Sequence, residues 1–200
     1  MEPSQLACII WKNTDEFPTI GNVCTAIEPR SRKKWERPGK DVLKINCDGA
    51  FRSETSVGGW GFVIRDSAGL VIRSGAGSCL HLMDALHAEL LACLAGVRAA
   101  GEMGMSNVII EIDSMLARLT LSTTTFALAP VGGIVYEIKY LMNLFFTSVN
   151  VAFFPRECNR VAHAVAALGS KCPPGAVLSW DGTPSGIEDL VTSDLTVSLV

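Results

Sequence analysis

Hydrophobic and polar residues alternate along several short segments of the chain. The clearest is VLKINCDGAF (42–51), in which apolar residues at 43, 45 and 47 alternate with polar residues at 44, 46 and 48. This period of two is typical of a strand that buries one face. With glycine-containing turns as boundaries, the pattern predicts strands at 42–51, 60–65, 70–77, 107–113 and 149–153. Short turns join the first three strands, which predicts an antiparallel meander.

Other segments follow a helical pattern. The longest, ALHAELLACLAGVRAAG (85–101), carries a leucine-rich stripe beside a face of alanines, follows Asp84 as an N-cap and ends at a glycine. Shorter helical patterns cover 114–119, 131–146 and 159–169. The order βββαβααβα, with its first, fourth and fifth strands parallel, requires right-handed crossovers. We therefore expect an α/β fold in which a five-stranded mixed sheet, three antiparallel strands and then two parallel ones, is flanked by helices.

The length of 200 residues suits one domain with tails. Residues 1–40 show no sustained periodicity and are interpreted as an N-terminal tail or linker, partly basic because of the run from Arg30 to Arg37. That run is either a solvated hinge or a patch that contacts phosphates or directs the chain to the nucleus. The domain is expected at 41–170, and the proline- and glycine-broken residues 171–200 are expected to form a loosely attached tail.

Composition narrows the class of protein. With 48% hydrophobic and 18% charged residues, the chain is expected to be soluble and globular. The longest apolar stretch, 86–97, is too short to span a bilayer, and residues 1–20 do not resemble a signal peptide. We therefore expect no membrane association and an intracellular location, in the nucleus or cytoplasm. Seven cysteines without a C-x-x-C pair indicate free thiols rather than disulfides or a zinc site.

The net charge of −3 argues against bulk electrostatic attraction to nucleic acid, so any such binding would depend on metal ions and a local patch. Candidate metal ligands are three acids on elements that should be buried: Asp48 on the first strand, Glu89 in an apolar helix and Asp113 at the end of the fourth strand. A buried carboxylate is costly unless it is paired or binds a cation. Each acid also has a structural explanation. Asp48 could belong to an Asp-Gly turn, Glu89 could reach solvent or pair with a lysine or arginine, and Asp113 could be a helix N-cap.

Four sequence blocks in order carry a family resemblance. They are KINCDGAF (44–51), GGWGFVIRDSAG (58–69), HAELLA (87–92) followed by IIEIDS (109–114), and NRVAHAVAALG (159–169). With these blocks, residues 43–169 resemble the type 1 ribonuclease H family, and most closely the reverse-transcriptase-like ribonuclease H domains of plants, which are related to retroelements.

The resemblance implies a monomeric endonuclease that hydrolyses the RNA strand of an RNA·DNA hybrid with two Mg²⁺ ions, for which Mn²⁺ could substitute. Asp48 would bridge both ions, and Glu89 and Asp113 would complete the first ion site. Glu89 would also help to orient the attacking water. Contacts to nucleic acid are implied at four further positions, which are Gly49, Ala50, Arg156 and Asn159.

The chain departs from the family pattern at several positions. His163 occupies the fourth metal position, where many members have aspartate, and imidazole is a poorer ligand for Mg²⁺. It either holds the second ion weakly or is a helix histidine without a ligand role. The loop before the last helix is reduced to 154–158, and Ala85, Leu86 and His87 replace polar residues that contact the hybrid in other members. Two hypotheses therefore stand: an active but weakened hybrid nuclease, and a catalytically impaired module that binds nucleic acid or a protein.

Overall fold

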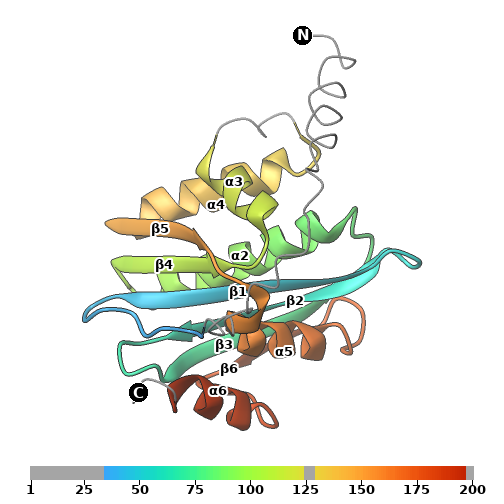
Figure 1. Cartoon of the computed structure of the whole chain (residues 1–200). Helices are drawn as coiled ribbons and strands as arrows, with labels where there is room; N and C mark the ends of the chain where they lie inside the picture. The colour runs from blue at the N-terminus through green and yellow to red at the C-terminus, as the bar shows by residue number, and fades with distance from the viewer. Residues whose placement is uncertain (1–33, 124–128, 197–200) are drawn as a thin grey trace, which may run out of the picture. The chain divides into compact units, whose positions relative to one another are not determined.

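The computed structural model describes residues 34–123 and 129–196 (Figure 1). Most of the expected N-terminal tail, with the start of its basic run, lies outside these residues, as do the last four positions of the chain. The helices and strands are, in chain order, β1 (Leu43–Arg52), β2 (Val57–Arg65), β3 (Val71–Cys79), α2 (Ala85–Glu102), β4 (Asn107–Ile112), α3 (Met115–Ser122), α4 (Gly132–Phe145), β5 (Ser148–Phe153), η1 (Arg156–Cys158), α5 (Arg160–Gly169), β6 (Val177–Trp180) and α6 (Glu188–Leu195).

One mixed sheet forms the centre of the domain, with the strand order β5-β4-β1-β2-β3-β6. β1 pairs antiparallel with β2, and β2 with β3, as the meander predicts. On its other side β1 pairs parallel with β4, which in turn pairs parallel with β5. The α/β fold, the parallel arrangement of β1, β4 and β5, and the four helices expected between 85 and 169 are confirmed.

The expected strand count is wrong, because the sheet has six strands rather than five. The sixth, β6, pairs antiparallel with β3 at the edge of the sheet, and α6 follows it. Both elements lie in the segment expected to be a loose tail. Val191 of α6 is buried in a cluster with Val161 and Val165 of α5, so the segment from 177 to 195 is packed onto the domain.

The two faces of the sheet carry separate hydrophobic clusters. Ile45 and Cys47 of β1 point to one face and are completely buried under α2. A Cβ atom at Gly96 of α2 would lie 2.7 Å from the Ile45 side chain, so the helix can approach this closely only with glycine there. On the opposite face α5 lies against β2, where a Cβ atom at Gly61 would come within 2.3 Å of the Ala166 nitrogen. Layers of helix therefore cover both faces of the sheet (Figure 1).

A buried polar network lies on the same sheet face as α5. Lys44 of β1 forms an ion pair with Glu111 of β4, with 2.6 Å between Nζ and Oε1. Asn46 Nδ2 donates to Glu111 Oε2 at 2.7 Å, and the Trp35 indole N–H points at the same oxygen and at Asn46 Oδ1, each at 3.1 Å. Trp35 is only 3% exposed, although it falls in the segment expected to be a tail.

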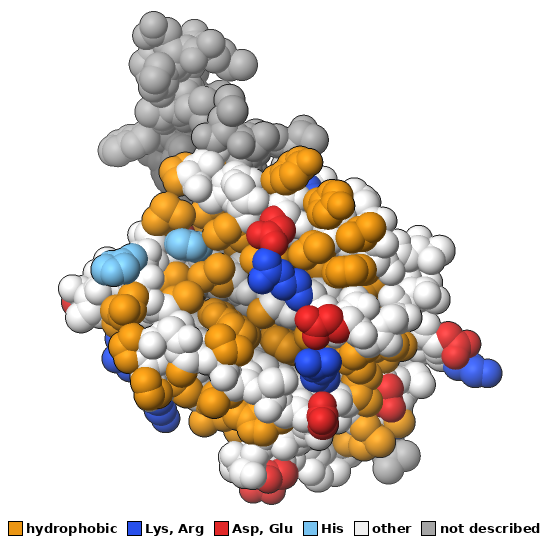
Figure 2. Space-filling view, turned by 180° about the vertical axis from the view of Figure 1, so that it is seen from behind, with side chains coloured by type: hydrophobic (Ala, Val, Ile, Leu, Met, Phe, Trp, Pro, Cys, Tyr) orange, Lys and Arg blue, Asp and Glu red, His pale blue; other side chains and the backbone are white. Residues whose placement is uncertain are grey.

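The face seen from behind carries many hydrophobic side chains, and acidic and basic side chains alternate near its middle (Figure 2). On α4, Tyr136, Tyr140 and Leu144 recur at every fourth position, and each is more than half exposed. Within the described part of the chain, no helix has the length and apolar character needed to cross a membrane.

Candidate metal and nucleic-acid site

Three carboxylates come together where the carboxyl end of β4 lies beside β1, and they belong to Asp48, Glu89 and Asp113. Each contributes a carboxylate oxygen, and these oxygens all lie within 4.8 Å of one another. Asp48 is in β1, Glu89 is in α2, and Asp113 directly follows β4. Residues that are far apart in sequence therefore form one carboxylate cluster, as the hypothesis of a metal site requires.

Strand register explains how two of these acids meet. Cys47 of β1 is paired with Ile112 of β4 in a parallel ladder, so Asp48 and Asp113 are the next residues on neighbouring strands. The carboxyl ends of adjacent parallel strands are where open α/β sheets place their sites. Glu89 is brought in by close packing, because a Cβ atom at Gly49 would lie 2.5 Å from the Glu89 backbone nitrogen. Gly49 thus lets α2 approach β1 beside Asp48.

None of the three acids has the purely structural role that its sequence position also allowed, namely a turn for Asp48, an exposed or paired side chain for Glu89 and a helix N-cap for Asp113. Asp48 lies inside β1, paired with Gly61, and is not part of a turn. Glu89 is 8% exposed and forms no ion pair with any described lysine or arginine. The N-cap of α3 is Ser114, whose hydroxyl accepts from the Ala117 N–H, and not Asp113.

Burial perturbs all three carboxyl groups. Desolvation, followed by the charges of Asp48 and Asp113, raises the pKa of Glu89 to about 10. Desolvation and the charge of Asp113 raise the pKa of Asp48 to about 6, against the opposing effects of His163 and Arg156. Burial also raises the pKa of Asp113. The raised pKa values indicate three carboxyl groups that are buried close together, with too little positive charge nearby to stabilise their ionised forms.

The donor set fits a divalent cation. Glu89 Oε2 and Asp113 Oδ2 are buried, and neither has a hydrogen-bond partner among the described residues. Buried carboxylate oxygens without partners are expensive, and hard cations such as Mg²⁺ prefer converging carboxylates. Glu111, two residues before Asp113, shows the contrast, because Lys44, Asn46 and Trp35 already satisfy its carboxylate.

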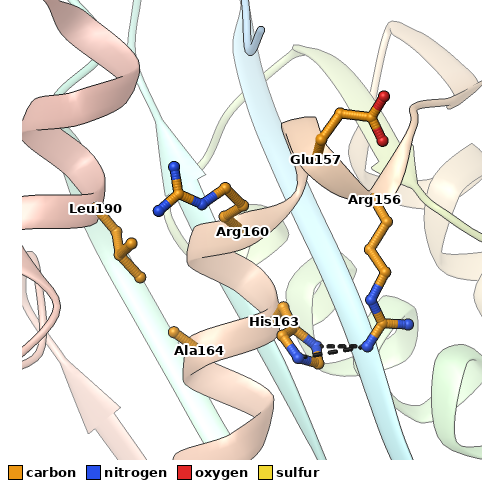
Figure 3. A pocket seen from close by; sticks show the side chains of 6 residues that line it. All are labelled: Arg156, Glu157, Arg160, His163, Ala164 and Leu190. Atoms are coloured by element: carbon orange, nitrogen blue, oxygen red, sulfur yellow. Dashed lines mark hydrogen bonds between the residues drawn. The ribbon is translucent and has the colours of Figure 1, made fainter. Parts of the chain in front are cut away.

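His163 of α5 contacts the cluster directly. Its Nδ1 atom lies 2.7 Å from Asp48 Oδ2, and Arg156 Nη2 lies 3.3 Å from each ring nitrogen of His163 (Figure 3). The histidine is therefore next to the acids, at the place where a fourth ligand would be. The side chain at the expected fourth ligand position is thus an imidazole, with the Arg156 guanidinium beside it.

The other predicted contact residues differ in accessibility. Arg156 is exposed, and Gly49 and Ala50 are partly exposed beside the acids. Asn159 is 1% exposed, and its Nδ2 donates to the Cys47 carbonyl oxygen at 2.8 Å. Asn159 therefore attaches the start of α5 to β1 one residue before Asp48, and its side chain is not presented to a ligand.

Sequence reasoning missed two residues near the site. Arg160 is exposed at the start of α5 and lines a pocket beside His163, together with Leu190 of α6. Arg160 is the second residue of NRVAHAVAALG (159–169), but a single arginine at the start of a helix carries no signal of its own. Leu190 lies in the segment interpreted as a tail, so nothing in its local pattern related it to the site.

The fold and the acidic cluster define an α/β domain of the ribonuclease H-like class. The sequence profile described as reverse transcriptase-like matches residues 46–169, more than half of the chain. The chain therefore belongs to the reverse-transcriptase-like family. Curated protein sequences give no match.

Several solved structures of ribonucleases H share this fold. The ribonuclease H1 of the archaeon Halobacterium salinarum superposes with a TM-score of 0.55 at 22% identity, over 64% of this chain and 96% of that chain. The N-terminal ribonuclease H domain of a Mycobacterium tuberculosis protein gives 0.56 at 20% identity, over 64% and 93%. LC11-RNase H1, in a complex with an RNA/DNA hybrid, gives 0.58 at 19% identity, over 64% and 96%. At these identities the likeness establishes the fold alone.

Proposed function

We propose that the protein is a metal-dependent endonuclease that hydrolyses the RNA strand of RNA·DNA hybrids. The observation that carries the proposal is the convergence of Asp48, Glu89 and Asp113, with buried carboxylate oxygens that lack partners among the described residues. Membership of the reverse-transcriptase-like family supports it, as does the likeness in fold to ribonucleases H, one of which was solved with an RNA/DNA hybrid.

The three acids would hold one divalent cation, and Asp48 together with His163 would hold a second. Mg²⁺ is the expected ion, with Mn²⁺ as a substitute. Bound divalent ions supply an activated water and stabilise the leaving oxygen in an in-line displacement.

The chain's own residues prepare this site. Glu89, with a pKa of about 10, keeps its proton at neutral pH until a cation displaces it. Asn159 fixes the start of α5 against β1 and so sets the position of His163 relative to Asp48. Arg156 lies beside His163 and presents a guanidinium to a phosphate oxygen of the substrate.

Charge distribution favours this face for nucleic acid. Arg156, Arg160 and His163 lie together at the start of α5. On the face seen from behind, the basic side chains near the middle stand beside acidic ones (Figure 2). A phosphate backbone is attracted by local positive charge, so the hybrid would bind over α5 and the acidic cluster.

A second candidate function is a catalytically impaired module that binds nucleic acid or a protein partner. The contact between His163 Nδ1 and Asp48 Oδ2, 2.7 Å long, favours it, because the imidazole occupies an oxygen that a cation would otherwise use. The nuclease remains the better-supported function, since Glu89 and Asp113 keep oxygens without partners in the described structure.

A cleavage assay tests the proposal. The protein is incubated with end-labelled RNA·DNA hybrid, duplex RNA and duplex DNA, each with Mg²⁺ or Mn²⁺. We expect slow cutting of the hybrid's RNA strand. The cutting should be faster with Mn²⁺ than with Mg²⁺, because imidazole is a better ligand for Mn²⁺. The matched control is Asp48→Asn, which keeps the shape of the side chain and removes its charge, and it should abolish the cutting. Equal residual cutting by both proteins would indicate a contaminating nuclease and support the impaired module.

A further inference from the structure

A pocket of about 450 Å³ lies between α5 and α6, outside the carboxylate cluster. Its volume is within the usual range for small-ligand sites. The lining residues are Arg156, Glu157, Arg160, His163, Ala164 and Leu190 (Figure 3). Since α6 supplies one wall, the pocket exists only because the C-terminal segment folds onto the domain.

The guanidinium of Arg160 is available to a ligand. It points towards α6, away from His163, whereas the Arg156 side chain extends to His163 (Figure 3). Arg160 forms no ion pair within the described part of the chain. Its charge acts on Asp194, but the Asp194 carboxylate is engaged by Arg65 at 2.9 Å. The Glu157 carboxylate points away from the pocket, so its interior is faced by arginine, histidine and apolar side chains (Figure 3).

Ala164 and Leu190 face each other across the pocket and give it an apolar floor. A guanidinium above an apolar floor suits a nucleotide, because the guanidinium binds phosphate oxygens while the sugar or base contacts the apolar side chains. His163 lines this pocket and also contacts Asp48 at 2.7 Å, so the pocket adjoins the carboxylate cluster.

We propose that this pocket is a subsite for a nucleotide of bound nucleic acid, next to the nucleotide at the carboxylate cluster, and that Arg160 contacts its phosphate. The subsite rests on the proposed function insofar as that function makes the ligand a nucleic acid. A free nucleotide offers the same chemistry, and the experiment distinguishes the two sources.

The test measures binding of fluorescently labelled RNA·DNA hybrid to the full chain by anisotropy, with Ca²⁺ in place of Mg²⁺ so that a cation is present at the carboxylate cluster while cutting is suppressed. Arg160→Ala should weaken binding about five- to tenfold and reduce the slope of log K against log salt by about 1, as expected for one lost phosphate contact. Arg160→Lys, which keeps the charge, should recover most of the affinity. Arg98→Ala, at an exposed arginine of α2 distant in sequence from α5, should leave both quantities within experimental error.

A second arm locates the contacted phosphate. Neutral methylphosphonate linkages are placed one at a time along each strand of the hybrid. One position should weaken binding by the wild-type protein and have no further effect on Arg160→Ala. An additive loss at every position, or an affinity unchanged by Arg160→Ala, would overturn the subsite.

A third arm titrates a free nucleoside monophosphate. Binding that Arg160→Ala removes, without any effect on the hybrid, would assign the pocket to free nucleotides and overturn the nucleic-acid subsite. The absence of hybrid binding by the wild-type protein would also overturn it. Failure of the proposed function is seen separately, as the absence of Asp48-dependent cutting in the cleavage assay.

Discussion

His163 Nδ1 lies 2.7 Å from Asp48 Oδ2, so an imidazole contacts one carboxylate oxygen of the cluster formed by Asp48, Glu89 and Asp113. We predict that His163→Asp lowers the Mg²⁺ concentration for half-maximal cutting by about tenfold, because carboxylate is a better Mg²⁺ ligand than imidazole. The measurement is the initial rate of hybrid cleavage over a Mg²⁺ titration.

The matched control for this prediction is His163→Asn, which removes the imidazole without adding a carboxylate. It should bring no gain in Mg²⁺ dependence. Identical Mg²⁺ titrations for the wild-type protein and His163→Asp would show that position 163 is not a ligand.

The pKa of Glu89 predicts how the stability of the metal-free protein depends on pH. In the folded state this pKa is about 10, against an ordinary value of 4.5. Between these values the folded protein holds a proton that the unfolded chain has lost, so the free energy of unfolding falls as pH rises. The slope should approach about 1.4 kcal/mol per pH unit. Urea unfolding between pH 6 and 9 in a chelator measures it.

Glu89→Gln cannot titrate and should flatten this dependence. Asp48, with a pKa of about 6, adds a similar fall in the free energy of unfolding, but only between its ordinary pKa of 3.8 and about pH 6. A saturating divalent cation should weaken or reverse the fall, because cation binding requires the deprotonated acids. A slope that is the same in wild type and Glu89→Gln would contradict the assignment to Glu89.

The pair Lys44 and Glu111 should be important for stability rather than for cation binding. Both side chains are nearly completely buried, with 2.6 Å between Nζ and Oε1. Glu111→Gln leaves the Lys44 charge buried without its counterion, which should cost about 3 kcal/mol in the free energy of unfolding. Lys44→Met in the same protein should recover part of that loss. Urea unfolding of the two single variants and the double variant gives the coupling energy.

Glu137→Gln supplies the comparison, because Glu137 pairs with Arg98 at the surface, where the two side chains are 43% and 52% exposed. An exposed pair is worth less than about 1 kcal/mol. Similar losses for Glu111→Gln and Glu137→Gln would show that burial of the Lys44 pair does not matter.

The sequence alone was sufficient to predict the elements that carry the acids. β1 and α2 have strong local periodicity, and a carboxylate on such an element is visible without any tertiary information. The meeting of Asp48 with Asp113 also followed, because parallel strands bring their carboxyl ends to one edge. The satisfied carboxylate of Glu111 was not distinguishable from Asp113 by pattern, since both residues point to the same side of β4.

The elements at the ends of the domain could not be predicted in this way. β6 is a four-residue edge strand whose side chains are largely exposed, so it has no alternating pattern of burial. Trp35 is buried by partners on β1 and β4, which are distant in sequence. Local pattern does not contain such pairings, and the prolines and glycine at 173–175 suggested a tail.

The C-terminal helix α6 should therefore contribute to the stability of the domain. Asp194 lies 2.9 Å from the guanidinium of Arg65, which is 1% exposed and stacks over the Trp35 ring at 4.2 Å. Asp194→Ala leaves that guanidinium buried without its acid, and we predict a loss of about 3 kcal/mol in urea unfolding. Asp189→Ala removes an exposed acid from the same helix and should change stability by less than about 1 kcal/mol. Equal unfolding midpoints for the two variants would mean that α6 lies on the domain without stabilising it. In that case α6, together with the pocket that it lines, could detach without lowering the stability of the domain.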